Sequence, residues 1–138
     1  MRTREVTSRV SAYAAHPLVR AAMGRAQRRI GEDGDLVCEG RDMGTVVFPD
    51  AAVKIYLDAS PAERARRRTA ELREKGEAAD EQSIRTEIER RDRLDSEREE
   101  APLRRSPEQV YVDSSAKDRD SVVAELERLA RERLEQLT

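Results

Sequence analysis

The sequence has very few aromatic residues. It contains no tryptophan, one phenylalanine and three tyrosines, or 3% of 138 residues. Because large aromatic side chains usually dominate big cores, we expect a small aliphatic core. Charged residues make up 41% of the chain, a composition that approaches the disordered class. Leucine, isoleucine and valine nevertheless recur at helical spacing, which favours folded helices over a solvated tail.

The chain also has no excess of one charge, no pair of cysteines and no long apolar run. Its 27 basic and 29 acidic residues nearly cancel, so we expect no nucleic-acid partner. Cys38 is the single cysteine, and it follows Leu36 and Val37. We expect it to be a small buried hydrophobic residue of a strand. No stretch could span a membrane and no signal peptide opens the chain, so we expect a cytoplasmic protein without membrane contact.

A glycine-rich phosphate loop is missing as well. Such a loop has the form G-x-x-x-x-G-K-[ST]; its backbone amides cradle the phosphates of ATP, its lysine reaches them, and its hydroxyl binds Mg²⁺. None of the six glycines begins such a run. The cradle that phosphoryl transfer from ATP requires is therefore not among these residues.

Hydrophobic spacing and turn residues predict alternating helices and strands. Helices are predicted at about 3–14, 17–30, 60–75, 80–99 and 118–137, and strands at about 35–39, 53–57 and 110–113. Ser60, Pro61 and Glu63 form a capping box at a helix start, and Gly76 is a typical C-terminal stop. This order predicts an α/β layer fold with a mostly parallel sheet.

Residues 39–50 are the most informative stretch. Arg41 and Asp42 lie between Gly40 and Gly44, directly after the predicted strand. Glycine permits a positive φ or a close approach to a ligand, and ligands of open α/β sheets bind beyond the carboxyl ends of strands. The stretch predicts a glycine turn that recognises a polar, anionic ligand, although Gly-Arg-Asp also occurs in ordinary surface turns.

The predicted helix 80–99 carries a second candidate site. Ile84 and Ile88 begin one face, which continues with Arg91, Asp95 and Arg98. Asp95 can pair with both arginines and fix their direction, and a guanidinium matches phosphate oxygens bidentately. The alternative is a surface ladder of ion pairs, each contributing a few tenths of a kcal/mol.

Two segments together resemble bacterial cytidylate kinase. They are Gly40-Arg41-Asp42-Met43-Gly44-Thr45-Val46-Val47-Phe48-Pro49 and Val53-Lys54-Ile55-Tyr56-Leu57-Asp58-Ala59-Ser60. The run Arg91-Asp92-Arg93-Leu94-Asp95-Ser96-Glu97-Arg98 matches the family's Arg-Asp-x-x-Asp-x-x-Arg pattern. The resemblance extends from about Arg2 to about Arg131 and implies transfer of the γ-phosphoryl group of ATP to CMP or dCMP, with Mg²⁺ required.

The resemblance implies an incomplete P-loop nucleoside monophosphate kinase fold with three layers, a mostly parallel sheet and the central first strand missing. It divides the chain into part of the helical monophosphate-binding region, the core strands with the glycine turn, the lid and CMP-contacting helices, and the last strand with the C-terminal helix, at 1–34, 35–60, 61–101 and 102–138. We expect a truncated protein that is marginally stable or associates through its incomplete sheet; a cooperative, concentration-independent melt of a monomer would contradict this.

The resemblance also implies the roles of single residues. Ser11, Arg20 and Asp42 would recognise cytosine, with Arg41 near the phosphates. Arg91 and Asp95 would contact the ribose of CMP, Arg91 would also lie near phosphate, and Arg98 would reach the cytosine or phosphate.

Further arginines would belong to a mobile lid that closes on ATP. The lid arginines Arg64, Arg67 and Arg68 would approach the ATP phosphates, and Ser114 would lie beside the adenine. An alternative is that Glu63 pairs with Arg67 as part of an ordinary helix surface. The resemblance thus assigns catalysis to Arg41, Arg91, Arg64 and Arg68, expects no metal ligand in this chain, and gives His16 no role.

Two other functions stay open. The chain could be a non-catalytic remnant that binds a pyrimidine monophosphate or a protein partner, which the missing phosphate loop favours. It could also be a helical interaction module with fortuitous charge pairs, against which the 40–49 segment argues. A truncated gene, an internal methionine taken as the start, or a deliberately shortened chain would each account for the missing loop.

Overall fold

The computed structural model describes residues 13–14, 16–32, 34–97, 102–103 and 105–136. Two parallel strands, β1 (Ile55–Asp58) and β2 (Val110–Asp113), form the sheet. The other described elements are helical: α2 (Pro17–Gly31), the π-helix η1 (Met43–Val47), α3 (Pro61–Glu74), α4 (Glu81–Ser96) and α5 (Arg119–Glu135). The protein is thus an α/β structure with a small parallel sheet, as the alternation of elements predicted.

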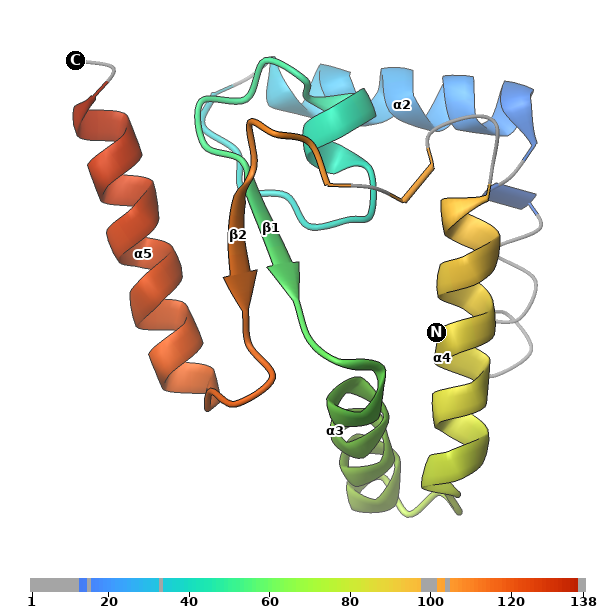
Figure 1. Ribbon diagram of the computed structural model, residues 1–138. Helices are drawn as coiled ribbons and strands as arrows, with labels where there is room; N and C mark the ends of the chain where they lie inside the picture. The colour runs from blue at the N-terminus through green and yellow to red at the C-terminus, as the bar shows by residue number, and fades with distance from the viewer. Residues whose placement is uncertain (1–12, 15, 33, 98–101, 104, 137–138) are drawn as a thin grey trace.

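Figure 1 shows how the helices surround the sheet. Helices α3 and α4 connect β1 to β2. Helix α3 lies beyond the carboxyl ends of the strands, α4 runs from there back to the level of the strands, and α2 and η1 lie at the opposite end. Helix α5 runs beside the sheet on the other side from α4. Within the sheet, Ile55 pairs with Val110 and Asp58 with Asp113.

The ends of the helices follow from their capping residues. Ser60 Oγ accepts a hydrogen bond from Glu63 N (3.2 Å), and Pro61 opens α3, which confirms the predicted helix start. Gly76 follows the helix at φ 75°, a left-handed conformation that glycine adopts without steric cost. Helix α4 begins after Asp80, whose Oδ2 accepts from Ser83 N at 2.8 Å.

The apolar core lies between α3 and α4. Ala65, Leu72 and Ile84 form one buried cluster, and Ala79 and Ile88 pack against it. Full burial of a side chain such as leucine or isoleucine contributes about 1.5–3 kcal/mol. This cluster therefore holds the two helices in a fixed relation, which in turn fixes the polar groups that they carry.

The strand predicted at 35–39 is not formed, and this prediction was wrong. Residues 35–39 have no regular structure, Val37 is fully exposed and Leu36 is 43% exposed. Cys38 is exposed too, so the prediction of a buried cysteine was also wrong. A strand is stabilised by hydrogen bonds to a neighbour, and the sheet of the described residues contains only β1 and β2.

The predicted turn around Gly40 and Gly44 is mostly a short π-helix. Val47 N donates to Asp42 O (3.2 Å) and Phe48 N donates to Met43 O (2.7 Å), bonds that span five residues. Gly40 is not at positive φ. Its role is a close approach, because a Cβ there would lie 2.7 Å from Met43 Cγ.

The other predicted helices and strands that fall on described residues agree with the structure to within a few residues at their ends. Of the predicted helix at 3–14, only residues 13–14 are among the described residues. Ser11 and Arg98 lie outside the described residues. Helix α4 ends at Ser96, three residues before the predicted end. No helix in the described part of the chain is both long and apolar enough to cross a membrane.

Candidate functional site

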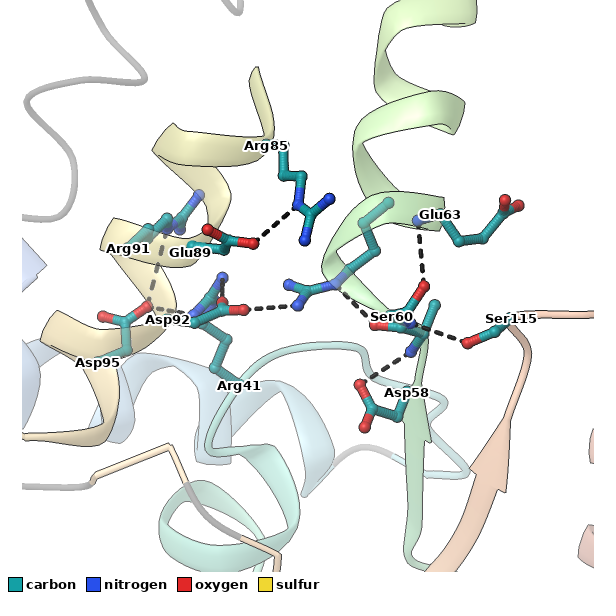
Figure 2. A network of polar contacts seen from close by, with 12 residues as sticks. Arg41, Asp58, Ser60, Glu63, Arg85, Glu89, Arg91, Asp92, Asp95 and Ser115 are labelled. Carbon is teal, nitrogen blue, oxygen red and sulfur yellow. Dashed lines mark hydrogen bonds and ion pairs between the residues drawn. The ribbon is translucent and has the colours of Figure 1, made fainter. Parts of the chain in front are cut away.

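Arg41 connects the segment before η1 to helix α4. Its Nη1 donates to Asp95 Oδ2, and its Nη2 donates to Asp92 Oδ1 at 3.1 Å. Figure 2 shows Arg41 reaching towards both carboxylates from below. Because Asp92 and Asp95 are three residues apart on α4, both carboxylates face the same way. One guanidinium thus occupies both, and its plane is fixed.

Asp92 also binds a second arginine, from helix α3. Arg64 Nη2 donates to Asp92 Oδ2 at 2.6 Å, while Arg64 Nε donates to the Ala59 carbonyl at 2.9 Å. The Asp92 carboxylate therefore bridges two guanidiniums with its two oxygens. Burial opposes its ionisation, but the hydrogen bond and charge of Arg64, together with Arg41, hold the pKa of Asp92 below its ordinary value.

Asp95 is the most buried carboxylate of this cluster. Only 5% of the residue is exposed, and besides Arg41 it faces Arg91, whose Nε lies 3.8 Å from Asp95 Oδ2. That separation is an ion pair rather than a hydrogen bond, and Arg91 Nε has no hydrogen-bond partner among the described residues. The predicted pairing of Arg91 with Asp95 is thus confirmed as an ion pair only.

Asp42 forms a separate pair with Arg20 of helix α2. Arg20 Nη2 donates to Asp42 Oδ2, and Arg20 Nη1 donates to the Ala14 carbonyl at 3.2 Å. Both side chains are largely buried, with 17% of Arg20 and 13% of Asp42 exposed. Within the described residues this contact uses one oxygen of the carboxylate, so Oδ1 has acceptor capacity that a ligand amine could use.

Arg67 joins helix α3 to the end of strand β2. Its Nη2 donates to the Ser114 carbonyl (2.6 Å), its Nη1 to Ser114 Oγ (3.1 Å), and its Nε to Glu63 Oε1 (2.7 Å). The open alternative for Arg67, a pair with Glu63, is therefore present alongside the contact with Ser114. Ser114 is itself 2% exposed and donates from Oγ to the Asp58 carbonyl at 2.9 Å.

Arg68 does not take part in these clusters. Its Nη1 donates to Glu71 Oε2 at 2.6 Å, and both side chains are exposed. The spacing of Arg64 and Arg68 suggested a shared face, but only Arg64 reaches the carboxylates of α4. A pair formed within one turn of helix competes for Arg68 and holds it at the surface.

Asp92 was not among the candidate residues predicted from the sequence. It lies in the Arg91–Arg98 run, but the predicted site included Arg91, Asp95 and Arg98 of that run and not Asp92. A signal was available, because Ile84, Ile88 and Asp92 are four residues apart and Asp95 follows three residues later. A carboxylate that continues an apolar face is placed where a neighbouring helix can supply a cation.

The described residues offer no ready-made metal site. No group of three or more histidine, cysteine, aspartate or glutamate side chains within them could hold a metal ion. The two carboxylates of the cluster, Asp92 and Asp95, pair with arginines instead. This cluster is therefore suited to bind anionic groups through its arginines, not to bind cations.

Comparison with known proteins gives a consistent result. The family model described as "Cytidylate kinase" matches residues 1–132. The chain is similar to "Cytidylate kinase" of Geobacillus kaustophilus (strain HTA426), with 47% identity over 134 residues, which are 97% of this chain and 60% of that protein. It is 46% identical to "Cytidylate kinase" of Geobacillus thermodenitrificans (strain NG80-2), with the same coverage.

A fused relative shows the same likeness. The chain is 47% identical over 135 residues to "Bifunctional pantoate ligase/cytidylate kinase" of Synechococcus sp. (strain WH7803), which covers 97% of this chain and 28% of that protein. The chain thus spans about 60% of the length of the Geobacillus relatives and a smaller share of the fused one.

Proposed function

The chain belongs to the cytidylate kinase family, and we propose that it carries the CMP- or dCMP-binding part of an enzyme that transfers the γ-phosphoryl group of ATP to these nucleotides, giving ADP and CDP or dCDP. The observation that supports this proposal best is the arginine–carboxylate cluster. Arg41, Arg64 and Arg91 come from different segments, and each lies against Asp92 or Asp95 of one helix. Guanidiniums fixed in this way can bind phosphate oxygens bidentately.

The pyrimidine base would be recognised at Asp42. The exocyclic amine of cytosine is a donor, and N3 and the carbonyl are acceptors. Asp42 Oδ1 would accept from the amine, while Arg20, bound to Oδ2, would hold the carboxylate in place. Arg20 and Ser11 would supply donors to the acceptor edge. A uracil ring has a carbonyl in place of the amine and would face the carboxylate unfavourably.

The ribose and the phosphate of CMP would lie towards helix α4. Asp95 accepts from Arg41 and pairs with Arg91, and in this proposal it would also contact a ribose hydroxyl. Arg41 and Arg91 would bind the α-phosphate oxygens, and Arg98, which lies outside the described residues, would reach the cytosine or the phosphate. These assignments make Arg41 and Arg91 direct contacts of the phosphoryl acceptor.

Arg64, Arg67 and Arg68 would approach the phosphates of ATP, and Ser114 would lie near the adenine. Arg64 supports this role, because it reaches the same carboxylate as Arg41. The transfer would depend on positioning and on neutralisation of the phosphoryl charge, since this chemistry needs no strong base. Arg68 would have to leave Glu71 to contribute.

Mg²⁺ would enter as the complex with ATP. This ion usually keeps several waters and is bound through one or two carboxylates plus the phosphates of the nucleotide. The described residues do not form a cage for it, so we assign none of them as a ligand. The ion's contribution would be to neutralise phosphate charge.

Binding of CMP is the direct test, because it does not require turnover. We expect isothermal titration of the 138-residue chain with CMP to show saturable binding. Asp42→Ala should weaken it by about 1.5–3 kcal/mol, the usual cost of losing a charged hydrogen-bond partner. Glu89→Gln, which removes an exposed carboxylate that pairs only with Arg85 among the described residues, serves as the control. An unchanged dissociation constant for Asp42→Ala would remove Asp42 from the site.

Turnover is tested separately with a coupled assay of ADP release from ATP and CMP. The G-x-x-x-x-G-K-[ST] run is not in this sequence, so we expect no CMP-dependent rate from the chain by itself. A rate that Arg91→Ala abolishes would show that another arrangement cradles the ATP phosphates. Binding without a rate would support the assignment of CMP recognition to these residues.

A further inference from the structure

Asp92 is the point at which the two halves of the arginine cluster meet. Its Oδ1 accepts from Arg41 Nη2 at 3.1 Å and its Oδ2 accepts from Arg64 Nη2 at 2.6 Å. Arg41 precedes η1 and Arg64 lies in the first turn of α3. The 24% exposure of the Asp92 side chain makes these contacts partly shielded from water.

The N–H groups of Arg41 and Arg64 that do not bind a carboxylate or a carbonyl are the ones that a ligand could use. Each guanidinium carries five N–H groups. Arg64 donates from Nε to the Ala59 carbonyl and from Nη2 to Asp92. Its Nη1 has no acceptor among the described residues. Arg41 donates one hydrogen bond from each Nη atom, to Asp95 and to Asp92. Both groups therefore keep donors for an anion while their planes are held by carboxylates.

We propose that Asp92 is a positioning residue, which holds Arg41 towards the phosphate of CMP and Arg64 towards the phosphoryl group that is transferred to it. This inference deepens the proposed function and rests on it. Asp92 itself does not touch the nucleotide. Fixing a long arginine side chain costs up to about 2 kcal/mol of rotamer entropy. The hydrogen bonds to Asp92 offset this cost before the nucleotide binds, so binding does not have to.

Asp92 is itself an anion, so it could also weaken phosphate binding. A carboxylate close to a phosphate repels it, and repulsion alone would make Asp92 a competitor for the two arginines. Three observations favour positioning. Asp92 lies on the same helix face as Ile84 and Ile88, which pack in the core; it bridges the arginines with separate oxygens; and Asp95 holds Arg41 on a second side.

The experiment compares CMP with cytidine, which lacks the phosphate. We expect Asp92→Asn to lower the ratio of the cytidine dissociation constant to the CMP dissociation constant about tenfold, while cytidine binding changes less than twofold. In an Arg41→Ala background, Asp92→Asn should change the ratio by less than twofold, because Asp92 acts through Arg41. Asp92→Glu keeps the charge with a longer stem, and we expect an intermediate ratio.

Glu89→Gln is the matched control, since Glu89 lies three residues earlier on α4 and pairs with the exposed Arg85. It should leave the ratio unchanged. The far-UV circular dichroism of each variant is compared with that of the unmodified chain. If Asp92→Asn is unfolded by this measure, the binding ratio of Asp92→Glu is used to test the inference instead.

Several outcomes would overturn the inference. An unchanged ratio would remove Asp92 from phosphate binding, and a higher ratio would show that it competes with phosphate. Equal weakening of CMP and cytidine would indicate a purely structural role. An equal effect in the Arg41→Ala background would mean that Asp92 does not act through Arg41. If the unmodified chain binds neither compound, the proposed function fails and this inference with it; saturable CMP binding by the unmodified chain separates the two failures.

Discussion

The pair of helices α3 and α4 and the sheet with helix α5 place their apolar side chains differently. The helix pair buries Ala65, Leu72 and Ile84 between its members. In the sheet, Leu57 is 50% exposed, Val110 43% and Tyr111 44%, and α5 has no buried residue. Only Val112 of the two strands is buried.

The charged side chains differ in the same way. Asp92 and Asp95 of α4 accept from arginines of other segments, whereas Arg128 and Glu132 pair within α5, and Glu125 of α5 pairs with Lys117 just before the helix. The helix pair, which has its own core, thus carries the carboxylates that arginines from other segments approach. The candidate site therefore lies against the helix pair, and the expected self-association of the sheet through its exposed residues stays a prediction.

The largest expected effect is on the core of the helix pair. Ile84 is 7% exposed, and Ile84→Ala should lower the free energy of unfolding by about 2–5 kcal/mol through lost burial and the cavity left behind. Val123 of α5 is 47% exposed, so Val123→Ala should change it by less than about 0.5 kcal/mol.

Urea denaturation followed by far-UV circular dichroism measures both variants. Equal losses for Ile84→Ala and Val123→Ala would show that α5 packs as closely as α3 and α4, and the contrast between the two regions would fail.

A smaller effect concerns the link between the regions. Arg67 is the side chain that joins α3 to Ser114 after β2. Arg67→Ala should lower the free energy of unfolding by about 1–2 kcal/mol, because its two hydrogen bonds to the buried Ser114 are lost and only Lys117 N still donates to the Ser114 carbonyl. Arg66→Ala removes a neighbouring arginine that pairs with Glu63 alone and is the control.

Hydrogen exchange would localise the change caused by Arg67→Ala. Faster exchange in β2 than in α4 would support a link to the sheet, whereas uniform acceleration would indicate general destabilisation.

The smallest expected effect is a pH dependence of the free energy of unfolding that arises from two carboxylates of α3. Hydrogen bonds from Arg66 and Arg67 lower the pKa of Glu63 to about 2, and those from Lys75 and Arg68 lower the pKa of Glu71 to about 2. Because the folded values lie below the ordinary value of 4.5, the stabilisation is complete above about pH 4.5 and is lost as the pH falls towards 2.

Salt should weaken this dependence, since both pairs are near the surface. Glu63→Gln with Glu71→Gln should flatten the stability curve between pH 4.5 and 2, measured by thermal melts at a series of pH values. A curve that keeps its slope in the double variant would assign the acid sensitivity to other carboxylates, with Asp92 the first to test.

Much of the local structure could be read from the sequence. The capping box at Ser60 and the stop at Gly76 predicted the ends of α3, the start of α4 was predicted at about Asp80, and β2 was predicted at its observed residues. These features depend on contacts within about four residues, which a sequence displays directly. The candidate residues Arg41, Asp42, Arg91 and Asp95 were also identified from short motifs, and their roles stay proposals.

Other features were decided by the tertiary structure. Residues 35–39 have the composition of a strand but lack a neighbouring strand among the described residues. Arg64 and Arg68 have equivalent places in the helix, yet one crosses to Asp92 and the other stays with Glu71. Local spacing fixes which face of a helix a side chain lies on. Partners from another element depend on how α3 and α4 pack, and that packing is what turned Asp92 into the shared acceptor of Arg41 and Arg64.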